Sequence, residues 1–399
     1  MHIRKIGDET PPQDEAQALK RPVVLIDVRL IGEAGGGFTT YQTQLAQAIH
    51  RVRERLLWRP VFLVREAGIL RLDRLGLKGL EFLETDINFL APDELWTLPQ
   101  LMKKVQARLW VSTTFSSLPT WLMPCPWLIA IHDLNHLKWG GLAQKIYYRR
   151  LLRPFARKAA RVLTVSDFSR RELSGWLKIP REEIRLACNA LDSVLSHPMT
   201  EGELDSGLAK FGLERDQFFL LLTNSKPHKN AAVLIQAWRE WADWQKERGV
   251  DPMPLVVSFP APVDGGVKGV KYVGGLGARE ARQMVRSART LFFPSLYEGF
   301  GLPPVEAIAQ GTPVCVSSIA PHREGLAEVD PKCIRWVTEP GSQAAWVAAI
   351  EDISKAPLLR PSVQEQGRIQ NRFSPEKMAE SWILEIDQAL GFGDRRGQP

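Results

Sequence analysis

Residues 295–313 read SLYEGFGLPPVEAIAQGTP, and this stretch decides how the fold is interpreted. It follows the apolar run TLFFPS (290–295), which is typical of a buried strand, and the glycines of Gly-Phe-Gly end that strand in a turn. Pro304 suits the first position of a helix, and Gly311 suits the residue just past its end. The stretch therefore predicts a strand, a glycine loop and a helix of about two turns.

Two acids flank this loop, Glu298 at its start and Glu306 in the expected first turn of the helix. Both would lie at the carboxyl end of a parallel strand, where open α/β sheets bind ligands. The loop amides and the positive helix end would attract a phosphate, whereas two carboxylates would repel one. We therefore assign the acids to sugar and ribose hydroxyls. Taken singly, Glu306 could equally be a helix-start acid and Glu298 a solvated loop acid.

The same organisation recurs along the chain. The run VVLIDVRLI (23–31) is rich in branched residues, as in a strand buried on both faces, and leads through glycines into a helical segment. Further strand-like runs lie at 60–64, 108–112, 126–133, 161–166, 218–224, 254–259, 270–274 and 313–318. Strands that alternate with helices in this way predict doubly wound parallel sheets.

A chain of 399 residues fits about two domains. The polar stretch 196–217 interrupts the alternation, and we place the domain boundary in it. The expected organisation is a polar leader (1–21), a first α/β domain (22–200), a second (201–374), and a C-terminal helix (375–390) that crosses back to the first domain.

Charge and composition narrow the functional classes. Residues 1–200 carry 29 basic against 20 acidic side chains, a charge of +9, and residues 201–399 carry 23 against 25, a charge of −2. A basic half suits phosphorylated small molecules, anionic lipid or nucleic acid. The four cysteines form no C-x-x-C pair, which favours reduced thiols over a zinc site or disulfides. Neither an export signal nor a membrane-spanning run is apparent, so we expect a cytoplasmic protein.

With these features in hand, residues 23–390 resemble the retaining nucleotide-sugar glycosyltransferases of the GT-B fold, family 4 type. The resemblance implies two Rossmann-like domains facing a cleft. It also implies that Glu298 contacts the hydroxyls of the donor sugar and Glu306 the ribose of the nucleotide. The loop between them would bind the donor through Gly299, Phe300, Gly301 and Leu302.

A second match is TNSKPHKNAAVLIQAW (223–238), which resembles the family segment that holds the donor diphosphate. Lys229 matches the family lysine, and Lys226 would assist it. Family members usually have a glycine at the position of Thr223 and an arginine near Asn224, and both are absent here. Their absence puts in doubt how much Lys226 contributes to holding the diphosphate. The alternative is a solvated basic helix start, which the helix dipole disfavours unless an anion is present.

Two further matches fall in the first half. In GGGFTTY (35–41), Gly36 and Gly37 would let backbone amides approach the same diphosphate, although an ordinary flexible turn would look the same. In IHDLNHL (131–137), the resemblance implies that His132 contacts the transferred sugar. A histidine that is satisfied inside the fold is the alternative.

The segment 143–162 carries seven basic residues and no acid, interleaved with apolar and aromatic residues. A basic amphipathic helix of this kind can lie on an anionic membrane surface, here the inner face. The alternative is a solvated helix face packed on the sheet, interrupted at Pro154.

The function expected from these features is retaining transfer from a nucleotide diphosphate sugar, with GDP-mannose preferred, to a hydroxyl of a glycan or lipid-linked glycan in envelope or exopolysaccharide synthesis. No Asp-x-Asp occurs, so neither a metal nor any cofactor beyond the donor is expected. The alternatives are a GT-B-fold nucleotide-sugar epimerase and a non-enzymatic two-domain ligand-binding protein. Nucleic acid is disfavoured because no recognition motif accompanies the basic residues.

Overall fold

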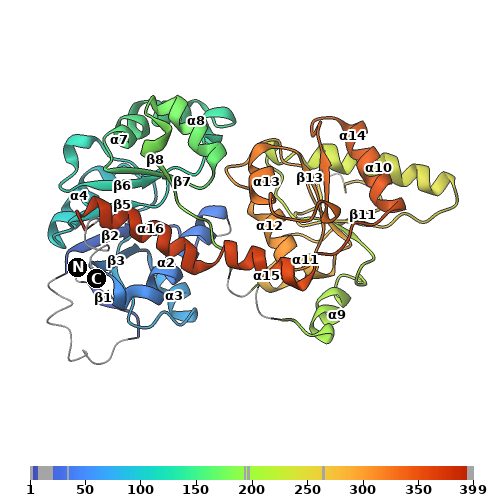
Figure 1. Ribbon diagram of the computed structural model, residues 1–399, viewed down its shortest axis with the longest axis horizontal. Helices are drawn as coiled ribbons and strands as arrows, with labels where there is room; N and C mark the ends of the chain where they lie inside the picture. The colour runs from blue at the N-terminus through green and yellow to red at the C-terminus, as the bar shows by residue number, and fades with distance from the viewer. Residues whose placement is uncertain are drawn as a thin grey trace. The chain divides into compact units, whose positions relative to one another are not determined.

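The computed structural model describes residues 3–7, 21–33, 36–192, 195, 198–262 and 266–392. The chain divides into two compact units, the first made of Met1–Ala190 with Phe373–Pro399 and the second of Leu191–Arg372. The chain thus leaves the first unit earlier than position 200, and it returns at Phe373 (Figure 1).

The first unit is built on an eight-stranded sheet in the order β1-β4-β3-β2-β5-β6-β7-β8. All pairs are parallel except β1 with β4. The strands are β1 (Arg4–Lys5), β2 (Val23–Asp27), β3 (Arg59–Val64), β4 (Glu81–Glu84), β5 (Leu109–Ser112), β6 (Trp127–Ala130), β7 (Arg161–Thr164) and β8 (Ile184–Leu186). The helices before the C-terminal one are α2 (Gly37–Val52), α3 (Glu66–Arg74), α4 (Glu94–Lys104), α5 (Asn135–Lys138), α6 (Leu142–Tyr147), α7 (Arg153–Arg157) and α8 (Asp167–Leu177).

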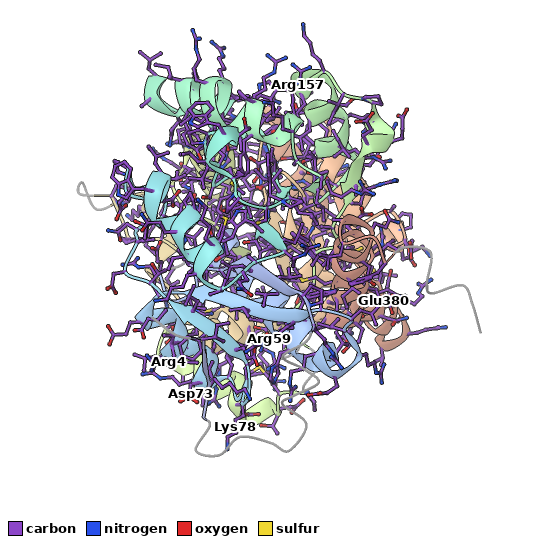
Figure 2. The ribbon with its side chains drawn as sticks, turned by 90° about the vertical axis from the view of Figure 1, so that its left-hand side faces the viewer. Arg4, Arg59, Asp73, Lys78, Arg157 and Glu380 are labelled. Atoms are coloured by element: carbon purple, nitrogen blue, oxygen red, sulfur yellow. The ribbon has the colours of Figure 1, made fainter. Side chains whose placement is uncertain are left out.

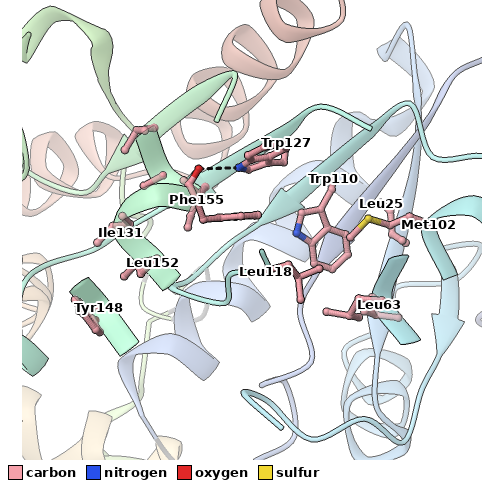
Figure 3. Packing of buried hydrophobic residues seen from close by; sticks show 14 of the residues in the cluster. Leu25, Leu63, Met102, Trp110, Leu118, Trp127, Ile131, Tyr148, Leu152 and Phe155 are labelled. Atoms are coloured by element: carbon pink, nitrogen blue, oxygen red, sulfur yellow. Dashed lines mark hydrogen bonds between the residues drawn. The ribbon is translucent and has the colours of Figure 1, made fainter. Parts of the chain in front are cut away.

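Apolar side chains on one face of this sheet, such as those of Leu63 and Trp110, pack with side chains of the covering helices to form a core cluster, as Figure 3 shows around Trp110. Strands β5 and β6 are buried at every position, because helices cover both faces of a doubly wound sheet. The indole of Trp127 stacks on Phe155 at 4.8 Å between ring centroids and donates to its carbonyl oxygen at 3.2 Å (Figure 3). The continuous apolar runs of the sequence therefore form central strands.

Helix α16 (Pro375–Ala389) completes the first unit by packing along α2 (Figure 1). The indole of Trp382 donates to the hydroxyl of Tyr41 at 3.0 Å, and the indole of Trp58 donates to Asp387 at 2.9 Å. All three aromatic side chains are at most 2% exposed. The last helix is thus part of the first hydrophobic core.

The second unit is a six-stranded parallel sheet in the order β11-β10-β9-β12-β13-β14. Its strands are β9 (Phe219–Leu221), β10 (Leu255–Val257), β11 (Val270–Tyr272), β12 (Thr290–Phe293), β13 (Val314–Ser317) and β14 (Ile334–Val337). Its helices are α9 (Glu201–Ala209), α10 (Ala231–Glu247), α11 (Ala278–Ser287), α12 (Leu302–Ala309), α13 (Ala320–Gly325), α14 (Gln343–Lys355) and α15 (Val363–Arg372).

Strand order reverses once in each sheet, between β2 and β5 in the first unit and between β9 and β12 in the second. At such a point the loops after the two strands diverge and leave a crevice at their carboxyl ends. Within the described residues, no helix has the length and apolar character that crossing a bilayer requires.

Candidate active site

The switch point of the second unit brings Lys229 and Glu298 together. Lys229 ends a short 3-10 turn (Pro227–Lys229) after β9, and Glu298 lies in the loop after β12. The amide of Leu296 donates to the carbonyl oxygen of His228 at 2.8 Å and so ties the two loops to each other. As a result, Lys229 Nζ lies 2.6 Å from Glu298 Oε1.

This ion pair is largely shielded from water. The side chains of Lys229 and Glu298 are 17% and 12% exposed, and the ammonium lies 5.4 Å from the ring centroid of Phe293. An ammonium has three donors, so Lys229 can keep Glu298 while it binds a second anion. A carboxylate held in this way can still accept hydrogen bonds from hydroxyl groups through its other lone pairs.

The loop after Glu298 offers free backbone donors. Gly301 has a φ of +88°, which favours glycine, and it caps α12. In the part of the chain that the structure describes, the amides of Gly301 and Leu302 donate no hydrogen bond. The next two residues are prolines, which have no N–H. Two unpaired amides beside a lysine are suited to an anion such as a phosphate.

The sequence led us to expect Glu306 in the first turn of the helix. In the structure it lies in the second turn of α12. The helix begins at Leu302, before Pro304, because Gly301 can cap it in a left-handed conformation and proline is tolerated throughout the first turn. Burial, with a smaller contribution from Asp192, raises the pKa of Glu306 to about 7. Its carboxyl group has no hydrogen-bond or ion-pair partner among the described residues, so it can receive a hydroxyl.

Lys226 has different surroundings from Lys229. It is exposed, and it lines a cavity of about 700 Å³ that the described residues form along α10. The lining includes Arg239, Phe259 and Tyr272 but not Glu298 or Lys229. The structure therefore brings Lys229 and Glu298 together, whereas Lys226 lies on a neighbouring surface three residues away.

One buried residue of the second unit was missed by sequence reasoning. His322 in α13 is 1% exposed and packs against Phe293 at 5.3 Å between ring centroids. Its ring also lies against Gly301, where a Cβ atom would come within 2.6 Å of His322 Cδ2. No periodicity or motif marks APHREG (320–325), so the sequence carries no signal for this contact.

In the first unit, Gly36 and Gly37 stand at the start of α2, which follows β2 at the switch point. Both are exposed, and a Cβ atom at either would meet nothing within 4 Å. Their φ values do not demand glycine: Gly36 is extended at 165°. Open backbone here leaves room for a ligand to approach the helix start, while Gly35 lies outside the described residues.

His132 follows β6, and its Nε2 lies 3.1 Å from the carbonyl oxygen of Thr113. A carbonyl accepts only, so Nε2 carries the proton. Burial lowers the pKa of His132 to about 4, which keeps the ring neutral near pH 7. Phe38 and Tyr41 hold the ring at 5.0 and 4.3 Å between centroids. Nδ1 has no partner among the described residues and is thus available as an acceptor.

A buried ionic cluster beside β2 was also missed. The guanidinium of Arg29 donates to Asp27 at 2.8 and 2.7 Å and lies 2.8 Å from Glu94. These three side chains are 0 to 5% exposed. Burial alone would lower the pKa of Arg29, but the two acids raise it by more than burial lowers it. The net pKa lies above the ordinary value, so the arginine stays charged. The only hint in the sequence is an Asp and an Arg inside the apolar run 23–31.

Within the described ranges, no group of three or more His, Cys, Asp and Glu side chains could hold a metal ion. The four cysteines, all within those ranges, are free thiols.

Two family models match the chain. The model described as "Glycosyltransferase Family 4" matches residues 35–194, and the model described as "Glycosyl transferases group 1" matches residues 265–370. The second match contains the loop with Glu298 and the α12 residue Glu306, and the first contains His132 and both glycines, Gly36 and Gly37.

Similar curated proteins are O-antigen chain mannosyltransferases. The chain is 26% identical over 238 residues to RfbU of Salmonella typhimurium, covering 57% of this chain and 61% of that protein. It is 30% identical over 187 residues to mannosyltransferase B of Escherichia coli, covering 43% and 47%. The chain thus matches only about half to three fifths of the length of these relatives.

Solved structures with a similar fold include Alr3699/HepE of Anabaena in complex with UDP-glucose, with a TM-score of 0.66 at 15% identity, covering 92% of this chain and 99% of that one. WaaG, described as a glycosyltransferase involved in lipopolysaccharide biosynthesis, has a TM-score of 0.62 at 13% identity, covering 93% and 100%. At these identities the likeness concerns the fold, and it establishes the GT-B architecture of two parallel-sheet domains.

Proposed function

Because the chain belongs to the GT-B glycosyltransferases of the family 4 type, we propose that it transfers a sugar from a nucleotide diphosphate sugar to an acceptor hydroxyl with retention of anomeric configuration. The observation that carries this proposal is the shielded pair of Lys229 and Glu298 beside two free amides at the switch point of the second unit. There, donors suited to an anion and a carboxylate suited to sugar hydroxyls lie next to each other.

In this proposal the second unit holds the donor. Lys229 and the amides of Gly301 and Leu302 bind the diphosphate, Glu298 accepts hydrogen bonds from sugar hydroxyls, and Glu306 accepts them from the ribose. In the first unit, His132 accepts a hydrogen bond from the transferred sugar through Nδ1. His132 would act as an acceptor and not as a donor, because its Nε2 proton is already donated to the carbonyl oxygen of Thr113.

The transfer breaks the bond between the anomeric carbon and the diphosphate oxygen and forms one to the acceptor oxygen. Negative charge grows on the leaving diphosphate, and Lys229 with the two amides stabilises it where it develops. The acceptor proton passes to the leaving phosphate, and no side chain of this chain is assigned as a nucleophile.

The proposed donor is GDP-mannose, and the proposed acceptor is a glycan or lipid-linked glycan of the cell envelope. The O-antigen mannosyltransferase relatives support this choice. We expect GDP-mannose or GDP at 100 times its Kd to stabilise the fold by about 2.7 kcal/mol, since it binds only the folded state. That amounts to a rise in Tm of about 5 to 10 °C.

A thermal-shift screen of GDP, UDP, ADP and their sugars measures this rise. If UDP-sugars alone shift Tm, the donor assignment is wrong but the transferase proposal stands. If no nucleotide shifts Tm, the transferase proposal fails. Product analysis without an acceptor separates transfer from epimerisation, because only an epimerase would change the sugar of the donor.

Metal independence is a second expectation. We propose that Lys229 and the amides of Gly301 and Leu302 supply the positive charge that a divalent ion supplies in other sugar transferases. Turnover should therefore be the same with EDTA in excess over divalent metal as without it. Loss of turnover in EDTA that Mg²⁺ or Mn²⁺ restores would refute this expectation.

We also propose that the protein works on the cytoplasmic face of the membrane through the segment Leu142–Arg157. This segment is continuous: α6 runs through a π-helical turn (Tyr148–Leu152) into α7, and Pro154 does not interrupt it. In the wider turn, the amide N–H of Arg153 donates a hydrogen bond to the carbonyl oxygen of Tyr148, as in a π-helical turn.

The two faces of this segment differ. Tyr148, Leu152 and Phe155 face the core at 2% exposure or less, whereas Leu142 and Ile146 are 76% and 53% exposed. Exposed arginines at 149, 150 and 157 accompany them, and no acid lies between 143 and 162. Arg157 lies at the opposite end of the first unit from Arg4 and Lys78 (Figure 2). A basic surface with protruding apolar side chains suits an anionic bilayer.

We expect the protein to float with vesicles that contain phosphatidylglycerol at low salt, and replacement of both Leu142 and Ile146 by serine should abolish flotation. Leu70→Ser is the matched control, because Leu70 is 53% exposed on α3 of the same unit. Absence of flotation in the unchanged protein at low salt would contradict the membrane proposal without affecting the transferase proposal.

A further inference from the structure

The tautomer of His322 is fixed by its surroundings. Its Nδ1 lies 2.9 Å from the carbonyl oxygen of Ser317, at the end of β13, so Nδ1 carries the proton. In a neutral ring, Nε2 is then a lone-pair acceptor. Burial lowers the pKa of His322, with Lys229 acting in the same direction and Glu298 against it. The side chain is therefore a neutral ring with a defined orientation.

The outer edge of this ring has no polar partner. Nε2 is buried and makes no hydrogen bond among the residues that the structure describes. Burying a polar atom without a partner costs free energy, so an apolar side chain or a shorter amide would serve packing alone better. The position of Nε2 indicates what the ring does contact: a Cβ atom at Gly301 would lie 2.9 Å from it.

Helix α13 supports the Glu298 loop at two points. At the first, the ring of His322 fills the space behind Gly301, and the Cγ of Glu298 lies 3.8 Å from the position of the same added Cβ. At the second, a Cβ at Gly325 would lie 3.4 Å from Phe300 Cζ. The loop thus lies between its own α12 and helix α13, against the ring of His322 and the backbone of Gly325.

We propose that His322 is a positioning residue for donor binding: its ring holds Gly301, and through it the carboxylate of Glu298 and the free amides of Gly301 and Leu302. This inference rests on the proposed function. A neutral ring suits the role, because a proton on Nε2 would place a second cation beside Lys229 and compete for Glu298. The hydrogen bond to Ser317 sets the angle at which the ring meets the loop.

Two substitutions separate the parts of this role. His322→Asn keeps an N–H donor close to where Nδ1 lies but removes the ring edge that reaches Gly301. His322→Phe keeps a ring of similar size but removes the donor to Ser317. Thr312→Val is the matched control, since Thr312 is buried in the same unit and its hydroxyl donates to the carbonyl of Val285 at 2.6 Å.

Calorimetry measures the affinity of each variant for GDP and UDP. Steady-state kinetics give KM and kcat for whichever nucleotide sugar the unchanged protein turns over. We expect both His322 variants to bind the nucleoside diphosphate about tenfold more weakly and to show a raised donor KM, as expected when a supporting contact is lost. The Thr312→Val control should lower Tm without changing either value.

A double-mutant cycle tests the contact itself. Gly301→Ala alone meets both the strain of a positive φ and the ring of His322, whereas in the His322→Asn background the second obstacle is gone. The loss of nucleotide affinity caused by Gly301→Ala should therefore be several-fold smaller in that background. Equal losses in both backgrounds would show that the ring does not hold the glycine and would overturn the proposal.

The two proposals fail in distinguishable ways. If the unchanged protein binds no nucleoside diphosphate, the proposed function is wrong and the role of His322 falls with it. If the unchanged protein binds one and His322→Asn binds it equally well, with Tm lowered as in the Thr312→Val control, then His322 is a packing residue and only the inference is overturned.

Discussion

Lys229→Ala should lower kcat by about 10²- to 10³-fold, the loss usually seen when one preorganised charge-stabilising group is removed from an active site. The ammonium pairs with Glu298 in the loop that carries the two free amides assigned to the diphosphate, and it is shielded from water, which strengthens its interaction with a developing anion. Turnover of the donor, measured under saturating conditions, checks this value.

The partner acid offers a way to separate chemistry from stability. Removing Lys229 alone leaves Glu298, whose side chain is 12% exposed, without its cation, so part of any loss could reflect a weakened fold. In the double variant Lys229→Met with Glu298→Gln, both charges are gone and Tm should recover. Turnover should stay low, because neither the diphosphate nor the sugar hydroxyls regain their partner.

Lys226→Ala is the matched control for the lysine. Lys226 is exposed and lies on the neighbouring cavity, so its removal should reduce turnover by about tenfold or less, as expected for a solvated charge. Near-normal turnover in Lys229→Ala and in Glu298→Gln would contradict the assignment of the donor site.

The central strands could be predicted from the sequence because they are buried on both faces. The runs at 60–64, 108–112, 161–166 and 290–295 each contain or overlap a strand of the structure. In such strands apolar side chains point to both faces, so the signal does not depend on knowing which face is inside. The recognition of the GT-B fold from these runs and the glutamate loop is confirmed by the family models and the solved structures.

The strands that the sequence did not predict lie at or next to the sheet edges. β1, β4, β8 and β14 are two to four residues long and read RK, EFLE, IRL and IRWV. Charged residues are common in edge strands, where one side of the ladder faces solvent. Their patterns resemble loops, and only pairing with a neighbouring strand distinguishes them.

The residues of the candidate site also divide into those that the sequence pointed to and those that it did not. Glu298 could be singled out from the sequence because glycine, proline and helix-start signals mark its loop, whereas Lys229 is assigned by the resemblance of residues 223–238 to a family segment. Neither His322 nor Arg29 has such a signal: each has an important contact far along the chain, with Gly301 and Glu94 respectively. Tertiary contacts of this kind, and the tautomers that they fix, become visible only in the folded chain.

Arg29→Met should destabilise the first unit by ~3–5 kcal/mol, which is the usual cost of removing one partner from a buried ion pair. The substitution preserves most of the volume but leaves Asp27 and Glu94, both at most 5% exposed on their side chains, without a cation. Urea unfolding followed by circular dichroism measures the difference, and Arg51→Met is the control. Arg51 pairs with Glu376 at 3.1 Å, but both side chains are more than 40% exposed, so its loss should cost less than about 1 kcal/mol.

The pH dependence of the Arg29→Met effect gives a second test, with a defined sign. Burial already raises the pKa of Glu94, and Arg29 opposes this rise. Without Arg29, the pKa of Glu94 in the folded variant rises further above its value in the unfolded chain. The variant therefore folds best with Glu94 protonated, and it loses stability as the pH rises from the unfolded-state pKa of Glu94 through the folded-state pKa. The difference from the unchanged protein should therefore be largest at neutral pH and should shrink towards pH values near the ordinary carboxyl pKa of about 4.3. A destabilisation of the same size at both pH values would mean that lost packing around the arginine stem, and not the uncompensated acids, sets the cost.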